Sequence, residues 1–256
     1  MPTVRQIIDH WPRLQRPAHF VYSLLLKLKN FIIRPLVDYG GHLPRSLSDR
    51  GQDTWVLEIF ERKRGGFFLD IGGADGFSES NTYILERVYD WAGICVEPNP
   101  SLFALLSARR KCTCVQEIID QNEAEVEFVL SGQESRLLGK TINRGFVLRK
   151  GEIIRLRAMT LESLLMRYRA PDTIDYFSLD VEGAETSILK PFPFNKYKFL
   201  SMTIERPSPE LNALLFKEGY VFVRNSLYDS FYVHETIPNF SRIPRQPFEQ
   251  LPAKGF

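Results

Sequence analysis

The chain has 256 residues, enough for one sizeable domain with short additions. Apolar residues make up 44% and charged residues 25%, as in an ordinary globular protein, and the formal net charge is +2. This near-neutral balance argues against a nucleic-acid partner, which usually requires a strongly basic surface. The three cysteines, an odd number, are typical of reduced core thiols rather than of a disulfide framework.

The sequence carries no signal for a membrane span or for secretion. No apolar run reaches the about 18 residues that a spanning helix needs. The N-terminus lacks the charged start, the short apolar core and the small-residue cleavage site of a secretory signal. We therefore expect a cytoplasmic protein.

Residues 1–47 form a separate N-terminal extension that is punctuated by prolines and contains one predicted helix at residues 20–34. Apolar residues recur in this helix at helical spacing, with lysine and arginine among them. A basic amphipathic helix of this kind can lie on an anionic membrane, which would make the protein peripheral to that membrane. We favour the alternative, in which the helix packs against the main domain or against a second copy in a homodimer.

From residue 65 onward, short apolar runs alternate with helical patterns. The predicted strands are residues 67–71, 93–96, 112–118, 126–130, 153–159, 174–179, 199–204 and 220–223. The predicted helices are residues 80–89, 100–110, 161–168, 184–189 and 209–218. Because this alternation requires crossover connections, it predicts an α/β fold with a doubly wound, mostly parallel sheet.

The main domain is predicted to span residues 48–234. Residues 230–234 alternate between apolar and polar side chains and are predicted to form an edge strand. A lone histidine in such a strand, here His234, is expected to be a surface residue. The tail, residues 235–256, contains four prolines and little periodicity, so we expect it to wrap the surface or to lack order.

The first chemical motif is an acidic glycine loop that follows the strand at residues 67–71. Its pattern is Asp-x-Gly-Gly-x-Asp-Gly, from Asp70 to Gly76, and it leads into the first predicted helix. In doubly wound sheets ligands bind at the carboxyl ends of strands, where glycines allow close backbone approach. Asp70 and Asp75 would repel the pyrophosphate of a dinucleotide, but they suit a ligand that carries ammonium and sulfonium groups.

The second motif is Glu97, which ends the next predicted strand and precedes Pro98 and Asn99. An acidic side chain at this place can accept hydrogen bonds from both ribose hydroxyls of a nucleoside ligand. A nicotinamide enzyme uses the same arrangement, but the acidic loop at Asp70 makes that alternative unfavourable. The two motifs together favour S-adenosylmethionine as the ligand.

The third motif places acids at the ends of two further strands. Asp180 and Glu182 follow the strand at residues 174–179, and Glu205 follows the strand at residues 199–204. The three carboxylates can hold Mg²⁺ or Ca²⁺ through oxygen, or one of them can act as general base toward a hydroxyl group. They can also bind a substrate by hydrogen bonds, or simply solvate the edge of the sheet.

The ordered set of motifs resembles the FkbM family of methyltransferases from about residue 48 to residue 234. The matching pieces are Gly51-Gln52-Asp53, residues 66–72, Ser80-Asn81-Thr82, Leu85-Glu86, Trp91-Ala92-Gly93, residues 96–99, Thr160-Leu161, residues 174–176, residues 179–185, Ile204-Glu205, Gly219-Tyr220 and residues 229–234. Each piece is weak alone, but their order and spacing are specific.

The resemblance implies a Rossmann-like class I methyltransferase fold, with S-adenosylmethionine as donor and a hydroxyl oxygen as the usual acceptor. Known members act on sugars, glycans, glycolipids and macrolide natural products, and for this chain we expect a sugar, glycan or glycosylated metabolite. By the resemblance, Asp70, Gly72 and Asp75 line the donor's amino-acid end and Glu97 binds its ribose. Ser80 and Asn81 lie near its carboxylate, and Asp120 is a candidate for its adenine. Gly73 and Asn99 are further candidates for cofactor binding. The alternative is a catalytically inactive, methyltransferase-like interaction module, and the intact Asp70, Glu97 and Asp180 argue against it.

The family is also similar in fold to magnesium-dependent catechol-type methyltransferases, whose metal-binding acids correspond to Asp180 and Glu205. Two departures leave Mg²⁺ open. Arg206 stands where FkbM proteins often have histidine, and Gly183 stands where the catechol-type enzymes have lysine. Asp180, Glu182 and Glu205 therefore all remain candidates for the catalytic base.

Overall fold

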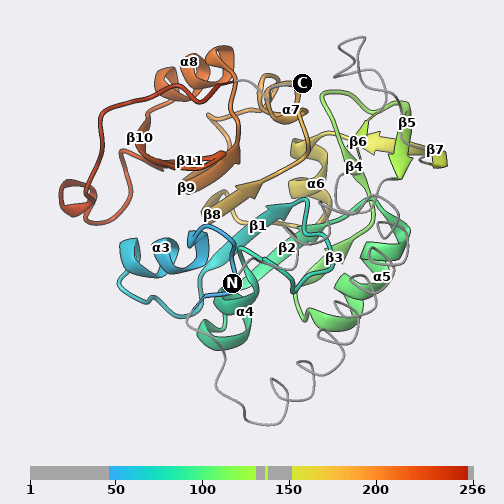
Figure 1. The fold of residues 1–256 in the computed structure, drawn as a ribbon, viewed down its shortest axis with the longest axis horizontal. Coiled ribbons are helices and arrows are strands. Elements are labelled where there is room, and N and C mark those ends of the chain that lie inside the picture. The colour runs from blue at the N-terminus through green and yellow to red at the C-terminus, as the bar shows by residue number, and fades with distance from the viewer. Residues whose placement is uncertain (1–45, 131–135, 138–151, 253–256) are drawn as a thin grey trace, which may run out of the picture. The chain divides into compact units, whose positions relative to one another are not determined.

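The computed structural model describes residues 46–130, 136–137 and 152–252 (Figure 1). The helix predicted at residues 20–34 lies outside the described residues. Among the described helices, none is long and apolar enough to cross a membrane.

The fold is built on a seven-stranded sheet with the order β10-β11-β9-β8-β1-β2-β3 (Figure 1). Its strands are β1 (Phe67–Ile71), β2 (Ala92–Val96), β3 (Thr113–Val115), β8 (Thr173–Leu179), β9 (Lys198–Glu205), β10 (Tyr220–Ser226) and β11 (Asp229–His234). The five neighbouring strands β3, β2, β1, β8 and β9 pair in parallel. Strand β11 pairs antiparallel with both β9 and β10. The predicted doubly wound α/β fold is confirmed.

The chain reverses its direction of winding at β1, which pairs with β2 on one side and with β8 on the other. A reversal of this kind leaves a crevice outside the carboxyl ends of the strands, which is where open α/β sheets bind ligands. Strands β1, β2, β8 and β9 therefore bring their carboxyl ends together at one edge of the sheet.

Six α-helices lie among the described residues, and three of them begin at a side-chain cap. They are α3 (Gln52–Ile59), α4 (Tyr83–Tyr89), α5 (Pro100–Arg109), α6 (Leu161–Arg167), α7 (Glu185–Leu189) and α8 (Pro209–Lys217). The side chains of Asn99, Thr160 and Ser208 each accept a backbone N–H of the helix that they precede. Proline follows two of these caps, at the position where its missing N–H leaves no helical bond unmade.

Two of the predicted strands, and part of a third, belong to a second sheet and not to the main sheet. The run at 112–118 is split into β3 and β4 (Ile118–Ile119), and β4 joins a second sheet of order β4-β7-β5-β6. That sheet also contains β5 (Glu125–Leu130), β6 (Arg136–Leu137) and β7 (Glu152–Met159), and β5 pairs antiparallel with β7. Phe128 and Ala158 of this sheet belong to a small apolar cluster of their own, and β5 begins with alternating polar and apolar residues, as in a sheet with one covered face.

Two further predictions are wrong in their boundaries or position. The helix predicted from Ser80 begins at Tyr83, because the Ser80 hydroxyl accepts the backbone N–H groups of Thr82 and Tyr83 in a preceding turn. The strand predicted at the edge is β11, which lies between β9 and β10. His234 is consequently buried, and its Nδ1 lies 2.8 Å from the Thr236 hydroxyl.

The described part of the C-terminal segment packs along α8 and β10. Gln250 accepts a hydrogen bond from Asn212 at 2.9 Å and donates one to the carbonyl of Pro207 at 2.8 Å. The ring of Phe248 contacts those of Phe216 and Phe222 edge to face.

Candidate functional site

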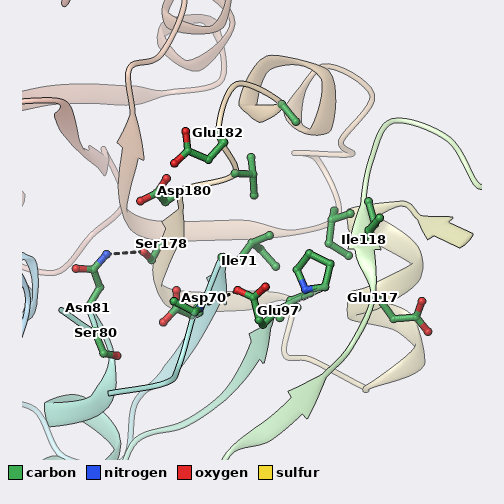
Figure 2. Close-up of a pocket in the computed structure, with 18 of the residues that line it drawn as sticks. Asp70, Ile71, Ser80, Asn81, Glu97, Glu117, Ile118, Ser178, Asp180 and Glu182 are labelled. Carbon is green, nitrogen blue, oxygen red and sulfur yellow. Dashed lines mark hydrogen bonds between the residues drawn. The ribbon is translucent and has the colours of Figure 1, made fainter. Parts of the chain in front are cut away.

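A cavity of about 300 Å³ lies where the carboxyl ends of β1, β2 and β8 meet (Figure 2). It is lined from one side by the loop after β1 and from the other by the residues that follow β8. The predicted site residues that line it are Asp70, Gly72, Gly73, Ser80, Asn81, Glu97, Asp180 and Glu182. Sequence motifs separated by more than 100 residues therefore share one cavity.

The loop after β1 is held tightly against both neighbouring strands. The backbone N–H groups of Gly72 and Gly73 both donate to the carbonyl of Val96 at 3.0 Å. Gly72 has φ +96°, and a Cβ there would lie 1.9 Å from the Asp180 carbonyl oxygen. Only glycine fits this approach, so the motif fixes the floor of the cavity.

Asp70 is buried near the end of β1, and its Oδ2 accepts the Thr82 hydroxyl at 2.6 Å. Burial raises the pKa of Asp70, while the Thr82 hydrogen bond and the charge of Arg110 lower it. The carboxylate is therefore tied to the turn before α4 and to a buried cation.

Arg110 is the buried cation behind this turn, and its side chain has 0% exposure. Its Nε donates to Glu86 at 2.5 Å, and its two terminal nitrogens donate to the hydroxyls of Thr82 and Ser80 at 2.9 and 3.3 Å. Because it satisfies these groups together, Arg110 orients the turn that carries Ser80 toward the cavity. Sequence reasoning missed Arg110, since an arginine at a helix end is usually solvated.

Glu97, at the end of β2, connects the loop after β1 with the loop after β2. Its Oε2 accepts the N–H of Ala74 at 3.0 Å, and its Oε1 accepts the N–H of Asn99 at 2.8 Å. Burial raises the pKa of Glu97 to about 7, against the lowering effect of these two hydrogen bonds. Glu97 thus holds the loops after β1 and β2 in register at the cavity wall.

Asn81 and Ser178 bridge the cavity between the start of α4 and β8. Asn81 Nδ2 donates to the Ser178 hydroxyl at 2.9 Å, as the dashed line in Figure 2 shows. The Asn81 Oδ1 is buried and has no hydrogen-bond partner among the described residues. Ser178 lies opposite Asp70 in the β1–β8 register. It was missed, although its position two residues before Asp180 places both side chains on one face of a strand.

Three acids form the group that we call the acid cluster: Asp180, Glu182 and Glu205. One carboxylate oxygen from each lies within 4.8 Å of the others. Asp180 lines the cavity and is exposed there. Neighbouring protein that displaces water from its carboxyl group, and then repulsion from Glu205 and Glu182, raises its pKa well above the ordinary value. Glu205 belongs to the cluster but does not line the cavity.

A fourth acid, Asp229, adjoins the acid cluster and was not assigned from the sequence. It lies directly opposite Glu205 in the β9–β11 register. Gln52, at the start of α3, donates to Asp229 Oδ2 at 2.9 Å. Burial and then the charge of Glu205 raise the pKa of Asp229 to about 6. Gln52, from the Gly51-Gln52-Asp53 motif, thus contacts the acid next to the cluster. Asp53 of the same motif accepts the backbone N–H groups of Leu47 and Ser48.

Three residues assigned to the donor do not line the cavity: Asp75, Asn99 and Asp120. Asp75 pairs with Arg109 at 2.5 Å and accepts the N–H of Ser78. Asn99 caps α5. Asp120 accepts the N–H of Gln121 at 2.6 Å. The Asp120 carboxylate also accepts the hydroxyl of Ser187, in α7, at 3.4 Å.

The sheet order and the crevice define an α/β protein of the Rossmann-like class. The chain matches the model of the methyltransferase FkbM domain over residues 70–224, which is more than half of its length. The protein belongs to the FkbM methyltransferase family, so the predicted resemblance is confirmed. S-adenosylmethionine is the methyl donor that the family and the fold imply.

Three solved structures with a similar fold are remote from this chain in sequence. They include TrmK of M. capricolum in complex with S-adenosyl-homocysteine, at 11% identity and TM-score 0.36, covering 70% of this chain and 65% of that one. A TehB-like SAM-dependent methyltransferase from Corynebacterium glutamicum has 9% identity and TM-score 0.38, covering 81% and 96%. A precorrin-6y C5,15-methyltransferase from Geobacter metallireducens has 10% identity and TM-score 0.39, covering 75% and 92%. No curated protein matches the chain.

The cavity fits an S-adenosylmethionine molecule by the chemistry of its walls. Gly72 lets the loop after β1 approach the Asp180 backbone, where a Cβ would clash, and the Asn81 Oδ1, which has no partner among the described residues, is an acceptor that suits an ammonium group. Glu97 offers carboxylate oxygens to hydroxyl donors. The acid cluster has the oxygen donors that Mg²⁺ prefers, but the Arg206 guanidinium lies beside it, with Nε 3.5 Å from Glu205 Oε1.

Proposed function

We propose that this protein is an S-adenosylmethionine-dependent O-methyltransferase that methylates a hydroxyl group of a sugar, glycan or glycosylated metabolite. The family supports methyl transfer. The observation that carries the choice of a hydroxyl acceptor is the acid cluster, because Asp180 and Glu182 line the donor cavity as well. A hydroxyl group must lose its proton when its oxygen is methylated, and a carboxylate beside the donor can take that proton.

Within this proposal, the two halves of the cavity have separate tasks. Asp70, Asn81 and Glu97 hold the donor, which supplies an electrophilic methyl group on its sulfonium when bound. Asp180 accepts the proton of the acceptor hydroxyl. Its pKa is raised above the ordinary value, so its carboxylate is a stronger base than that of an ordinary aspartate.

Donor binding is tested by calorimetric titration with S-adenosylhomocysteine. We expect micromolar affinity for the wild type and a loss of at least about tenfold in Asp70→Ala and Glu97→Ala. Asn81→Ala should weaken S-adenosylhomocysteine but not 5′-methylthioadenosine, which lacks the amino-acid end. A folded wild type that binds neither ligand would contradict the proposal and favour the inactive interaction module.

Acceptor chemistry is tested with radiolabelled donor and a panel of saccharides. A methyl ether on a hydroxyl survives mild base, whereas a methyl ester on a carboxylate is hydrolysed. Asp180→Asn should lower the rate by about 10²–10⁴-fold, the usual contribution of a general base, while S-adenosylhomocysteine affinity stays within about threefold. The matched control is Asp90→Asn, an exposed aspartate paired with Arg64. Base-labile product would overturn the choice of a hydroxyl acceptor.

A further inference from the structure

Arg206 follows Glu205 at the end of β9 in a backbone conformation that an arginine rarely adopts. Its φ is +42°, in the left-handed region where a side chain costs about 1 kcal/mol relative to glycine. Its N–H donates to the carbonyl of Tyr228 at 2.7 Å, so the turn between β10 and β11 holds this conformation. The strained backbone fixes where the Arg206 side chain begins.

The guanidinium of Arg206 is held by packing beside the acid cluster. Its Cζ lies 3.8 Å from the centroid of the Tyr228 ring, a close cation–π contact. Its Nε lies 3.5 Å from Glu205 Oε1, and the two side chains are only 17% and 15% exposed. The Nε is buried and makes no hydrogen bond to the described residues. Ring stacking, rather than a hydrogen bond to Glu205, therefore sets the place of this charge.

The charge balance explains why a fixed cation belongs here. Asp180, Glu182 and Glu205 lie within 4.8 Å of one another, and Asp229 stands opposite Glu205. Carboxylates this close repel each other unless a positive charge compensates them. A divalent cation would serve, but a guanidinium already occupies the edge of the cluster, and it would repel such an ion.

We infer that Arg206 is the resident counter-ion of the acid cluster, so that the cluster binds divalent cations only weakly and methyl transfer needs no metal. Arg206 is a positioning residue, which acts through Glu205 and does not touch the reacting atoms. The statement about cation binding stands without the proposed function, whereas the statement about methyl transfer rests on it.

The first experiment measures Mn²⁺ binding to the full chain by the electron paramagnetic resonance signal of free Mn²⁺. We expect no binding to the wild type below about millimolar concentration, and binding at least about tenfold tighter in Arg206→Gln, because the repelling charge is gone. Arg206→Lys should behave as the wild type, since it keeps the charge. Adding Asp180→Asn to Arg206→Gln should abolish the gain, which places the ion at the acid cluster.

Equal S-adenosylhomocysteine affinity and equal thermal midpoints show that the Arg206 variants are folded. Micromolar Mn²⁺ binding by the wild type, or no gain in Arg206→Gln, would overturn the inference. The second experiment measures methyl transfer in EDTA. The wild type should keep its activity, and loss of activity that Mg²⁺ restores would overturn the metal-free reaction. A wild type with no methyl transfer at all would refute the proposed function, while the Mn²⁺ result would still decide the role of Arg206.

Discussion

The two halves of the site differ in how their charged side chains are paired. On the donor half, Asp70 is bonded to Thr82, Arg110 joins Thr82 to Glu86, and Glu97 accepts two backbone N–H groups. In the acid cluster, carboxylates face one another, and their repulsion contributes to the raised pKa of Asp180. Paired charges and backbone hydrogen bonds hold the loops around the cavity in place, whereas carboxylates that face one another oppose folding and are expected where proton transfer takes place.

The largest expected effect is a loss of stability when Arg110, which lies behind the turn before α4, is replaced. Arg110→Met should lower the free energy of unfolding by about 3–5 kcal/mol, because it leaves the buried carboxylate of Glu86 without its partner. Urea denaturation monitored by circular dichroism measures this change.

The matched control removes both charges. Arg110→Met combined with Glu86→Gln should recover more than half of the loss, since no unpaired charge remains buried. A double variant that is no more stable than the single variant would mean that packing, and not the buried ion pair, explains the effect.

A second prediction distinguishes backbone strain at a glycine from the close approach of Gly72 to the Asp180 carbonyl. Gly72→Ala should lower S-adenosylhomocysteine affinity by about 100-fold or more, because its Cβ must displace the Asp180 carbonyl. Gly65 also has positive φ, +67°, but a Cβ there meets nothing within 4 Å. Gly65→Ala should therefore lose only the stability that its left-handed backbone conformation costs, and it should keep its affinity. Equal S-adenosylhomocysteine affinity in the two variants would show that Gly72 is not part of the donor site.

Much of the fold follows from apolar periodicity, and its errors have a common physical cause. Runs that are covered on both faces, such as β1 and β8, were predicted within one or two residues. The strands β5 and β7 were assigned to the wrong sheet because their alternation was not given weight against the crossover pattern. One covered face gives alternation, as Glu125, Val126 and Glu127 display.

For the site, the sequence identified residues at the ends of strands but not the residues that act through others. Asp70, Glu97 and Asp180 were predictable because the ends of parallel strands converge. Asp75 carries the same chemistry in the same loop but pairs with Arg109, and only the fold of the loop shows this. Arg110 and Asp229 were missed because their partners, Glu86 and Gln52, lie far away in sequence.

The last comparison is between stability and binding at Glu97, whose pKa is raised from 4.5 to about 7. Between these pH values the folded protein holds a proton that the unfolded chain has lost, so the free energy of unfolding falls as the pH rises. The contribution of Glu97 is on the order of 3 kcal/mol. Urea denaturation between pH 5 and pH 8 should show this slope, and Glu97→Gln should flatten it.

Donor binding should depend on pH in the opposite direction. Ribose hydroxyls donate to a carboxylate, so the bound donor favours ionised Glu97, and S-adenosylhomocysteine affinity should rise by up to about tenfold per unit as the pH approaches 7 from below. Titrations at pH 5.5, 6.5 and 7.5 measure this rise, which Glu97→Gln should abolish. An affinity that falls with rising pH would assign the ribose to another residue. Opposite slopes in one protein would mean that the donor binds the form of Glu97 that the empty fold disfavours.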